Sequence, residues 1–189
     1  MRDVTAVMVD EHRLILRMIT LVEHNAARLE AGEYRDWQFF LDAVAFIRNY
    51  ADRFHHAKEE HVLFKELVRN GMPAENSPVA AMLLAHDQGR AFVKGMEIGA
   101  LRGRSGAEDA AAQVVANSRG YAALLREHIH TEDHILYPLA ERVLPADWRD
   151  GMAAAYASAE EDAPPGLQER YHTLVEGYEA ELREAGTGA

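Results

Sequence analysis

The segments FHHAKEEHVLF (residues 54–64) and EHIHTEDHILY (residues 127–137) decide the fold of this chain, because they are two copies of one helical pattern. Aligned with each other, the copies share four identical residues, in the pairs His55/His128, Glu59/Glu132, His61/His134 and Leu63/Leu136. The repeat therefore predicts two similar halves, each of which carries the pattern His-x-x-x-Glu.

A single histidine precedes each copy at nearly the same distance, His12 before His55 and His86 before His128. Residues four apart on a helix point in the same direction, and apolar residues flank each of these positions. Counting along helices joined by short turns brings the histidines of each half to the same level. The sequence thus directs six side chains into one core: His12, His55, Glu59, His86, His128 and Glu132.

Apolar residues recur with a helical period along nearly the whole chain, which predicts an all-α protein. The pattern indicates long helices near residues 4–31, 35–70, 78–102 and 107–143, followed by shorter helices near 147–160 and 166–185. Short connections between long helices favour an up-down-up-down four-helix bundle. We expect that bundle over residues 1–145, with a C-terminal helical extension over 146–189 that covers apolar surface or forms an oligomer contact.

Glycine, proline and serine mark the ends of the long helices. Gly32 is expected to end the first helix, and Ser77 to cap the third with Pro78 at its first position. Ser105 and Glu108 have the spacing of a capping box at the start of the fourth helix.

Composition excludes several classes of protein. The chain has 189 residues, and 20 Lys+Arg against 31 Asp+Glu give a formal net charge of -11, which disfavours binding to nucleic acid. It has 0 Cys, so disulfides, thiolate zinc sites and cysteine-ligated iron–sulfur clusters are excluded. Neither a signal peptide nor a membrane-spanning segment is indicated, and we expect a cytoplasmic protein without a membrane partner.

Four imidazoles and two carboxylates in an apolar core need partners, because an unpaired buried charge costs several kcal/mol. Coordinating a cation would satisfy them. A set of nitrogen and oxygen donors with two carboxylates fits a pair of first-row ions, with iron or manganese more natural than copper and no thiolate to favour zinc.

The remaining polar residues of the two halves receive other interpretations. His56 is expected to be a structural partner of Glu60, with a supporting role at the metal as the alternative. Asp133 is an alternative to Glu132 as the second carboxylate. We expect solvent-exposed positions for most of the other histidines, and inward positions near the donors for two further side chains. The exposed histidines are His61, His130, His134 and His172, while His24 lies about 18 Å along the helix from His12 and cannot serve the same ion. The inward residues are Arg90 and Tyr121, which either steer an anionic oxygen species or pack at the edge of the core.

These motifs resemble the hemerythrin-like family of HHE cation-binding domains, over residues 4 to about 143. The resemblance implies a four-helix bundle that holds a non-haem di-iron centre, with manganese or zinc as alternatives, and two glutamates that bridge the ions. Carried over, the ligands are His12, His55, Glu59, His86, His128 and Glu132.

One departure from the family concerns its oxygen carriers, which place two histidines four apart on the third helix. Here Met82 and Arg90 lie four residues to either side of His86. With fewer imidazoles the ions are more open, which disfavours simple reversible oxygen carriage.

The resemblance implies binding of, or reaction with, oxygen, nitric oxide or peroxide, in sensing, iron handling or defence against oxidative and nitrosative stress. Whether the protein is an enzyme, with peroxidase, catalase-like or nitric-oxide-reducing activity, stays open. The alternatives are a non-enzymatic, metal-dependent regulatory or interaction module, and a structural zinc or manganese bundle. The extension offers a surface for a homo-oligomer.

Overall fold

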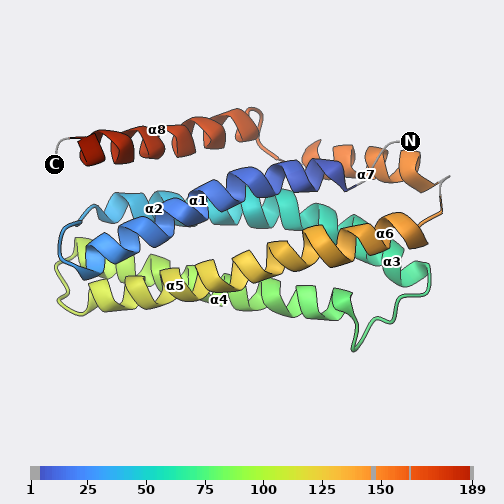
Figure 1. Cartoon of the computed structure of the whole chain (residues 1–189), viewed down its shortest axis with the longest axis horizontal. Helices are drawn as coiled ribbons and strands as arrows, with labels where there is room; N and C mark the ends of the chain where they lie inside the picture. The colour runs from blue at the N-terminus through green and yellow to red at the C-terminus, as the bar shows by residue number, and fades with distance from the viewer. Residues whose placement is uncertain (1–4, 146–147, 162, 188–189) are drawn as a thin grey trace.

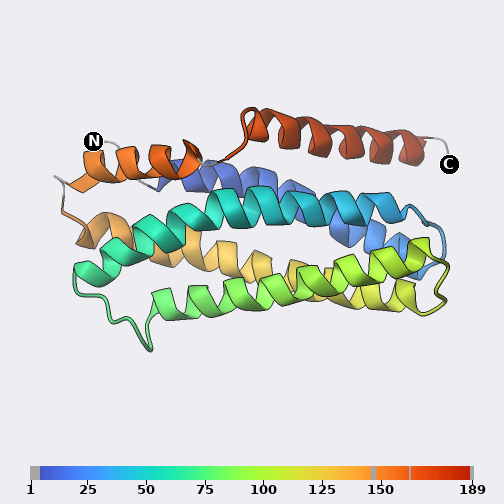
Figure 2. The same cartoon turned by 180° about the vertical axis from the view of Figure 1, so that it is seen from behind.

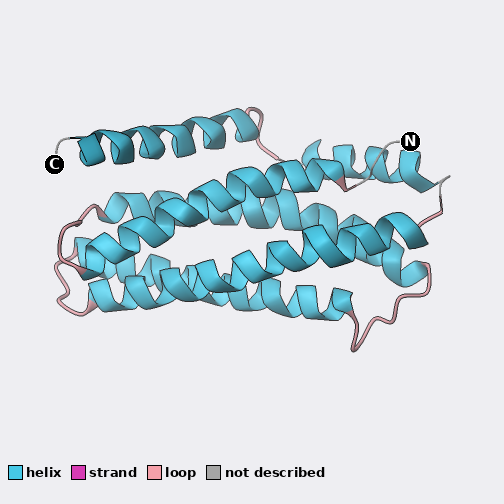
Figure 3. Cartoon of the chain, in the orientation of Figure 1, coloured by secondary structure: helices cyan, strands magenta, loops and turns pink. Residues whose placement is uncertain are grey.

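Four antiparallel helical rods form a bundle, and two further helices lie along one side of it (Figures 1 and 3). The computed structural model describes residues 5–145, 148–161 and 163–187. Within those ranges every regular element is a helix, so the predicted all-α, up-down-up-down architecture with a helical extension is confirmed. The predicted helix starts at residues 4 and 147 lie outside the described residues.

The rods follow the order of the chain (Figure 2). The first is α1 (Ala6–Glu30) and the third is α4 (Pro78–Arg104). The second joins α2 (Trp37–Phe46), η1 (Ile47–His56), η2 (Glu59–Leu63) and α3 (Phe64–Arg69). The fourth joins α5 (Ala110–Thr131), η3 (Glu132–Leu136) and α6 (Tyr137–Val143). The extension consists of α7 (Arg149–Glu161) and α8 (Leu167–Thr187).

Two of the three predicted helix boundaries are confirmed. Gly32 follows α1 with a φ of 78°, a left-handed conformation that glycine adopts without strain. The Ser77 side chain accepts a hydrogen bond from the Ala80 amide at 3.2 Å, and Pro78 opens α4.

The capping box at Ser105 is wrong. Helix α4 continues to Arg104, and Ser105 ends it, with its hydroxyl donating to the Leu101 carbonyl at 3.2 Å. Asp109 precedes α5 instead. A serine serves either end of a helix in short loops, so the spacing alone did not discriminate between them.

The two repeat copies contain π-helical turns, in which the amide bonds to the carbonyl five residues before it. The Phe64 amide donates to the Glu59 carbonyl, and the Tyr137 amide donates to the Glu132 carbonyl. In the second rod, η1 adds a longer π-helical stretch that ends at His56. These wider turns change the direction of side chains relative to a regular α-helix.

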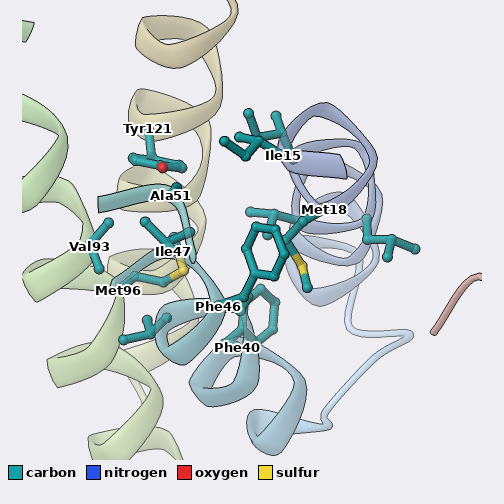
Figure 4. Close-up of a cluster of buried hydrophobic side chains, with 14 of the residues drawn as sticks. Ile15, Met18, Phe40, Phe46, Ile47, Ala51, Val93, Met96 and Tyr121 are labelled. Carbon is teal, nitrogen blue, oxygen red and sulfur yellow. The ribbon is translucent and has the colours of Figure 1, made fainter. Parts of the chain in front are cut away.

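The interior of the bundle contains two apolar clusters. The aromatic cluster, which includes Met18, Phe40, Phe46, Val93 and Met96, fills the half nearer the end of α1 (Figure 4). The N-terminal cluster, which includes Met8, Leu63, Val79, Met82 and Leu136, fills the other half. In every rod the predicted donors fall between members of the two clusters, so the donors form a polar layer with apolar packing on both sides.

The extension covers apolar surface of the bundle, which is one of the two roles expected for it. Helix α8 contributes Leu167, Tyr171 and Val175 to the aromatic cluster, and Glu179 pairs with Arg17 of α1 through two contacts of 2.8 Å. Helix α7 contributes buried side chains to the N-terminal cluster. None of the described helices has the length and apolar character needed to cross a bilayer.

Candidate metal centre

The six predicted donors converge in the polar layer, and each is at most 3% exposed. Each half contributes the same set from two rods, a histidine from the first rod and His-x-x-x-Glu from the second. Four imidazoles and two carboxylates therefore meet within a water-poor core.

The imidazoles form two pairs whose nitrogens face each other. The Nε2 atoms of His12 and His55 are 2.9 Å apart, and those of His86 and His128 are 3.0 Å apart. Two imidazoles that bind one ion at a right angle, each about 2.1 Å from it, hold their nitrogens about 3.0 Å apart. The rings of each pair are steeply inclined, at 60° and 69°. Each pair thus has the geometry to share one ion.

The two glutamates lie between the histidine pairs. Glu132 Oε2 is 3.4 Å from His12 Nε2, and Glu132 Oε1 is 3.1 Å from His128 Nε2. Glu59 Oε2 is 3.8 Å from His55 Nε2 and 3.5 Å from His86 Nε2. Each carboxylate therefore reaches both pairs.

Three of these carboxylate oxygens lack a hydrogen-bond partner among the described residues: Glu59 Oε2, Glu132 Oε1 and Glu132 Oε2. Buried oxygens of this kind are normally satisfied, because leaving one unpaired costs free energy. Cations between the pairs would satisfy all three, so the donor set fits two metal ions.

Carboxylates on the far side of three rings fix their orientation. Each accepts a hydrogen bond from Nδ1–H, which leaves the Nε2 lone pair directed at the centre in the neutral ring. The pairs are His12–Asp133 at 2.7 Å, His55–Glu11 at 2.8 Å and His86–Glu60 at 2.7 Å. Two lone pairs about 3 Å apart repel each other, so a cation, either a proton or a metal ion, must lie between the rings of a pair.

Glu60 and Asp133 occupy matching positions in the two repeat copies and have matching roles. Each follows a central glutamate and holds the single histidine of a neighbouring rod. Asp133 contacts the outer nitrogen of His12, Nδ1. The oxygens of Glu132 face both histidine pairs, so the geometry favours Glu132 over Asp133 as the central carboxylate.

Without metal, protons take the cation positions. Burial lowers the pKa of His12, but the nearby carboxylates of Asp133 and Glu132 outweigh this effect and raise the pKa to about 10. Burial also lowers the pKa of His86, but the nearby carboxylates of Glu59 and Glu60 raise it to about 9. Burial lowers the pKa of His55 to about 3. One ring of the first pair is therefore charged and the other neutral at pH 7.

His56 is not the partner of Glu60, and this expectation is wrong. Its Nδ1 lies 3.4 Å from Asp52, whereas Glu60 contacts His86 and Arg90. The buried ring stacks on His86, with centroids 3.7 Å apart and planes at 10°. The π-helical turn of η1 brings His56 inward, a rotation that α-helical periodicity does not predict.

A nitrogen of His56 lies within 4.8 Å of donor atoms of Glu59, His86 and His128, which makes it a candidate seventh donor. An imidazole binds an ion in the plane of its ring. Two nearly parallel, stacked rings have no common in-plane point, so His56 in this orientation does not share an ion with His86. It forms a wall beside the second pair.

Two further residues at the centre were not singled out from the sequence. The Tyr137 hydroxyl donates to Glu59 Oε1 at 2.5 Å, and its ring stacks on His12. Lys58 is fully buried and forms ion pairs with Glu11 and with Glu160 of α7. Their only sequence signal is position: Tyr137 ends the second repeat copy, and Lys58 precedes Glu59.

The remaining expectations concern residues around the centre. Four of the other histidines are exposed, as predicted, namely His61, His130, His134 and His172, and His24 is exposed as well. The inward position expected for Arg90 is wrong, because its side chain is 41% exposed and its guanidinium contacts Asp52 and Glu60 near the surface. Tyr121 is buried, as expected.

Comparison with known families gives a match to the part of the chain that contains the six predicted donors. A family model described as the hemerythrin HHE cation-binding domain matches residues 3–140. Searches of curated proteins and of solved structures gave no match. The matched segment contains all six donors and ends within α6, before the extension.

Proposed function

The chain belongs to the hemerythrin family of HHE cation-binding domains, and from this premise we propose that it is a non-haem di-iron protein that binds or reacts with a small ligand. The ligand is oxygen, nitric oxide or peroxide. The role is sensing, iron handling or defence against oxidative and nitrosative stress.

In this proposal His12 and His55 hold one ion, His86 and His128 hold the other, and Glu59 and Glu132 bridge the two. The observation that carries it is the facing arrangement of the Nε2 atoms, at 2.9 Å and 3.0 Å, next to three unpartnered carboxylate oxygens. The absence of cysteine and the nitrogen and oxygen donors favour iron or manganese over softer ions.

When bound, an iron pair supplies electrons to a small ligand and an open coordination position for it. The protein supplies the surroundings. Asp133, Glu11 and Glu60 hold three rings in place, and Tyr137 holds one oxygen of Glu59. The aromatic cluster and the N-terminal cluster exclude water from both sides of the layer.

Metal analysis of protein purified without chelator tests the proposal, together with the optical spectrum expected for oxo-bridged ferric iron. We expect two iron ions per chain. His55→Ala and Glu132→Ala should each abolish the spectrum, because each removes a buried donor. His134→Ala changes an exposed histidine of the same repeat and should leave the spectrum intact. Equal loss in all three variants would contradict the ligand assignment.

A second candidate function, a metal-dependent regulatory module, is favoured by one specific chain of contacts. Glu160 of α7 pairs with Lys58, Lys58 pairs with Glu11, and Glu11 accepts from His55. Occupancy of the centre can thus act on the extension. Turnover of peroxide or nitric oxide by iron-loaded protein supports the first function, whereas a ligand-dependent change in assembly without turnover supports the second.

A further inference from the structure

A cavity of about 80 Å³ lies beside the second histidine pair, between the second, third and fourth rods. Its walls are mostly apolar, and His86 itself forms part of them. Other lining residues are His56, Gly89, Arg90, Val93 and Tyr121. It has room for a molecule of a few atoms, because roughly 10–15 Å³ of such space is enough for one water molecule.

One polar group on the wall has no partner. The Tyr121 hydroxyl is buried and makes no hydrogen bond to any described residue, and its ring belongs to the aromatic cluster (Figure 4). Because a buried hydroxyl is normally satisfied, an unpartnered one that lines a cavity indicates a bound acceptor. Burial raises the pKa of Tyr121 far above its usual value, so the hydroxyl keeps its proton.

A glycine on the cavity wall stands where the repeat has a bulky side chain on the other side. Gly89 follows His86 by three residues, and the matching residue after His12 is Ile15, which is 2% exposed. A Cβ added at Gly89 would lie 3.5 Å from the Tyr121 ring, so a longer side chain there would occupy the cavity. Similarly, His56 is matched by the buried Ile129. The repeat therefore places Ile15 and Ile129 where the cavity has Gly89 and His56.

Arg90 marks the outer side of the cavity. It is partly exposed, and its guanidinium binds Asp52 of the second rod and Glu60, the residue that holds His86. These ion pairs join the third rod to the second across the cavity's outer edge. A ligand that enters from solvent therefore passes a charged rim and reaches an apolar interior.

We infer that this cavity is the chamber for the small exogenous ligand, so that ligands reach the ion held by His86 and His128 and not the ion held by His12 and His55. This inference rests on the proposed function and specifies which of the two ion positions the ligand reaches. The ligand class is a molecule of two or three atoms with an oxygen or nitrogen acceptor, to which the Tyr121 hydroxyl donates. His56 is the second polar group of the chamber.

Xenon tests the cavity independently of metal, because it occupies small apolar cavities. Crystals of the metal-free protein under xenon pressure should show xenon between Gly89 and Tyr121. Gly89→Ile should remove it, since the new side chain fills the space, and Ile15→Val should not. Xenon sites of equal occupancy in wild-type and Gly89→Ile crystals would overturn the inference.

Azide tests ligand access in iron-loaded protein, by optical titration and with iron content measured for every variant. Gly89→Ile should weaken azide binding at least about tenfold, equivalent to about 1.4 kcal/mol, at unchanged iron content. Tyr121→Phe should weaken it about two- to tenfold, the range expected for one hydrogen bond, and should leave the xenon site in place. Ile15→Val, the matched change in the other half, should bind azide like the wild type.

The outcomes separate this inference from the function on which it rests. Wild-type protein that holds no iron overturns the proposed function. Iron-loaded Gly89→Ile and Tyr121→Phe proteins with wild-type azide affinity overturn the chamber alone. Weaker azide binding in Gly89→Ile and in Tyr121→Phe, with none in Ile15→Val, supports it.

Discussion

The chemistry of the centre depends on the positions of individual side chains. Some of these positions could be predicted from the sequence, and others could not. The six donors could be predicted because a duplicated spacing places them on facing surfaces. Glu11, Glu60 and Asp133 could not be assigned their contacts, because a carboxylate next to a donor points outward on an ideal helix. Tyr137 needed the three-dimensional position of Glu59, since a tyrosine at an apolar position predicts only packing.

The outer carboxylates provide a test at this scale. Glu60→Gln and Asp133→Asn each weaken the hydrogen bond that orients a histidine, so each should lower metal affinity about 10- to 100-fold. Competition against a chelator of known affinity measures the change. Asp10→Asn is the control, because Asp10 is an exposed acid of α1 that pairs with Arg13. A comparable loss of metal affinity in all three variants would mean that the loss comes from removing a negative charge and not from losing the orientation of a histidine.

Metal uptake should depend on pH in a defined direction. His12 and His86, with pKa values of about 10 and about 9, hold protons in the metal-free protein at pH 7, and an ion must displace them. Apparent affinity should therefore rise with pH towards 9, with proton release detected by calorimetry in buffers of different ionisation enthalpy. Affinity that is flat between pH 7 and 9 would contradict this.

The same two groups set the stability of the metal-free protein. Because their pKa values are raised above the usual 6.5, their stabilising contribution is complete below pH 6.5 and is lost as pH rises through about 9 to 10. The free energy of unfolding of metal-free protein, from urea titrations, should therefore fall between pH 7 and 9. Metal-loaded protein is the control and should change less over that range.

Among the elements, the helical rods were predictable and their irregularities were not. Gly32 and the Ser77-Pro78 pair act locally, so their sequence signals were sufficient. The π-helical turns at Glu59, Glu132 and His56 arise where the rods meet around the donors, and local propensity does not report such contacts. This is why the partner of His56 was predicted to be Glu60, whereas it is Asp52.

The contact between the second rod and α7 gives a prediction at the scale of elements. Lys58→Met leaves Glu11 buried without its cation, and this should destabilise the protein by about 3–5 kcal/mol. Glu160→Gln removes the other, partly exposed partner and should cost less than about 1 kcal/mol. Urea unfolding of the two variants measures the difference. Equal effects would show that Lys58 serves mainly to hold α7.

At the scale of the whole molecule, the two segments on either side of the boundary predicted at residue 145 pack together in both apolar clusters. Tyr171 of α8 packs on Phe46 and Tyr50 of the second rod, and its hydroxyl donates to the Ala45 carbonyl. The extension was recognisable as helical from sequence. Its packing partners were not, because an amphipathic helix does not specify which apolar surface it covers.

Tyr171→Ala should therefore destabilise the bundle itself, by about 3–5 kcal/mol, as expected for removal of a large buried aromatic side chain. Thermal unfolding followed by circular dichroism measures the loss, and iron content should stay at the wild-type level because the donors lie elsewhere. His172→Ala, an exposed neighbour on α8, is the control. An unchanged melting temperature in Tyr171→Ala would mean that the extension folds apart from the bundle.

The polar layer has a consequence for cooperativity. In every rod the donors separate the aromatic cluster from the N-terminal cluster. The interior therefore consists of two apolar clusters with the polar layer between them. If the six donors bind ions as proposed, these ions would connect all four rods, and we expect the two clusters to unfold together. Without ions, we expect the end of the bundle around Met8 and Leu136 to open while the aromatic end stays folded. Metal binding would then turn two folding units into one.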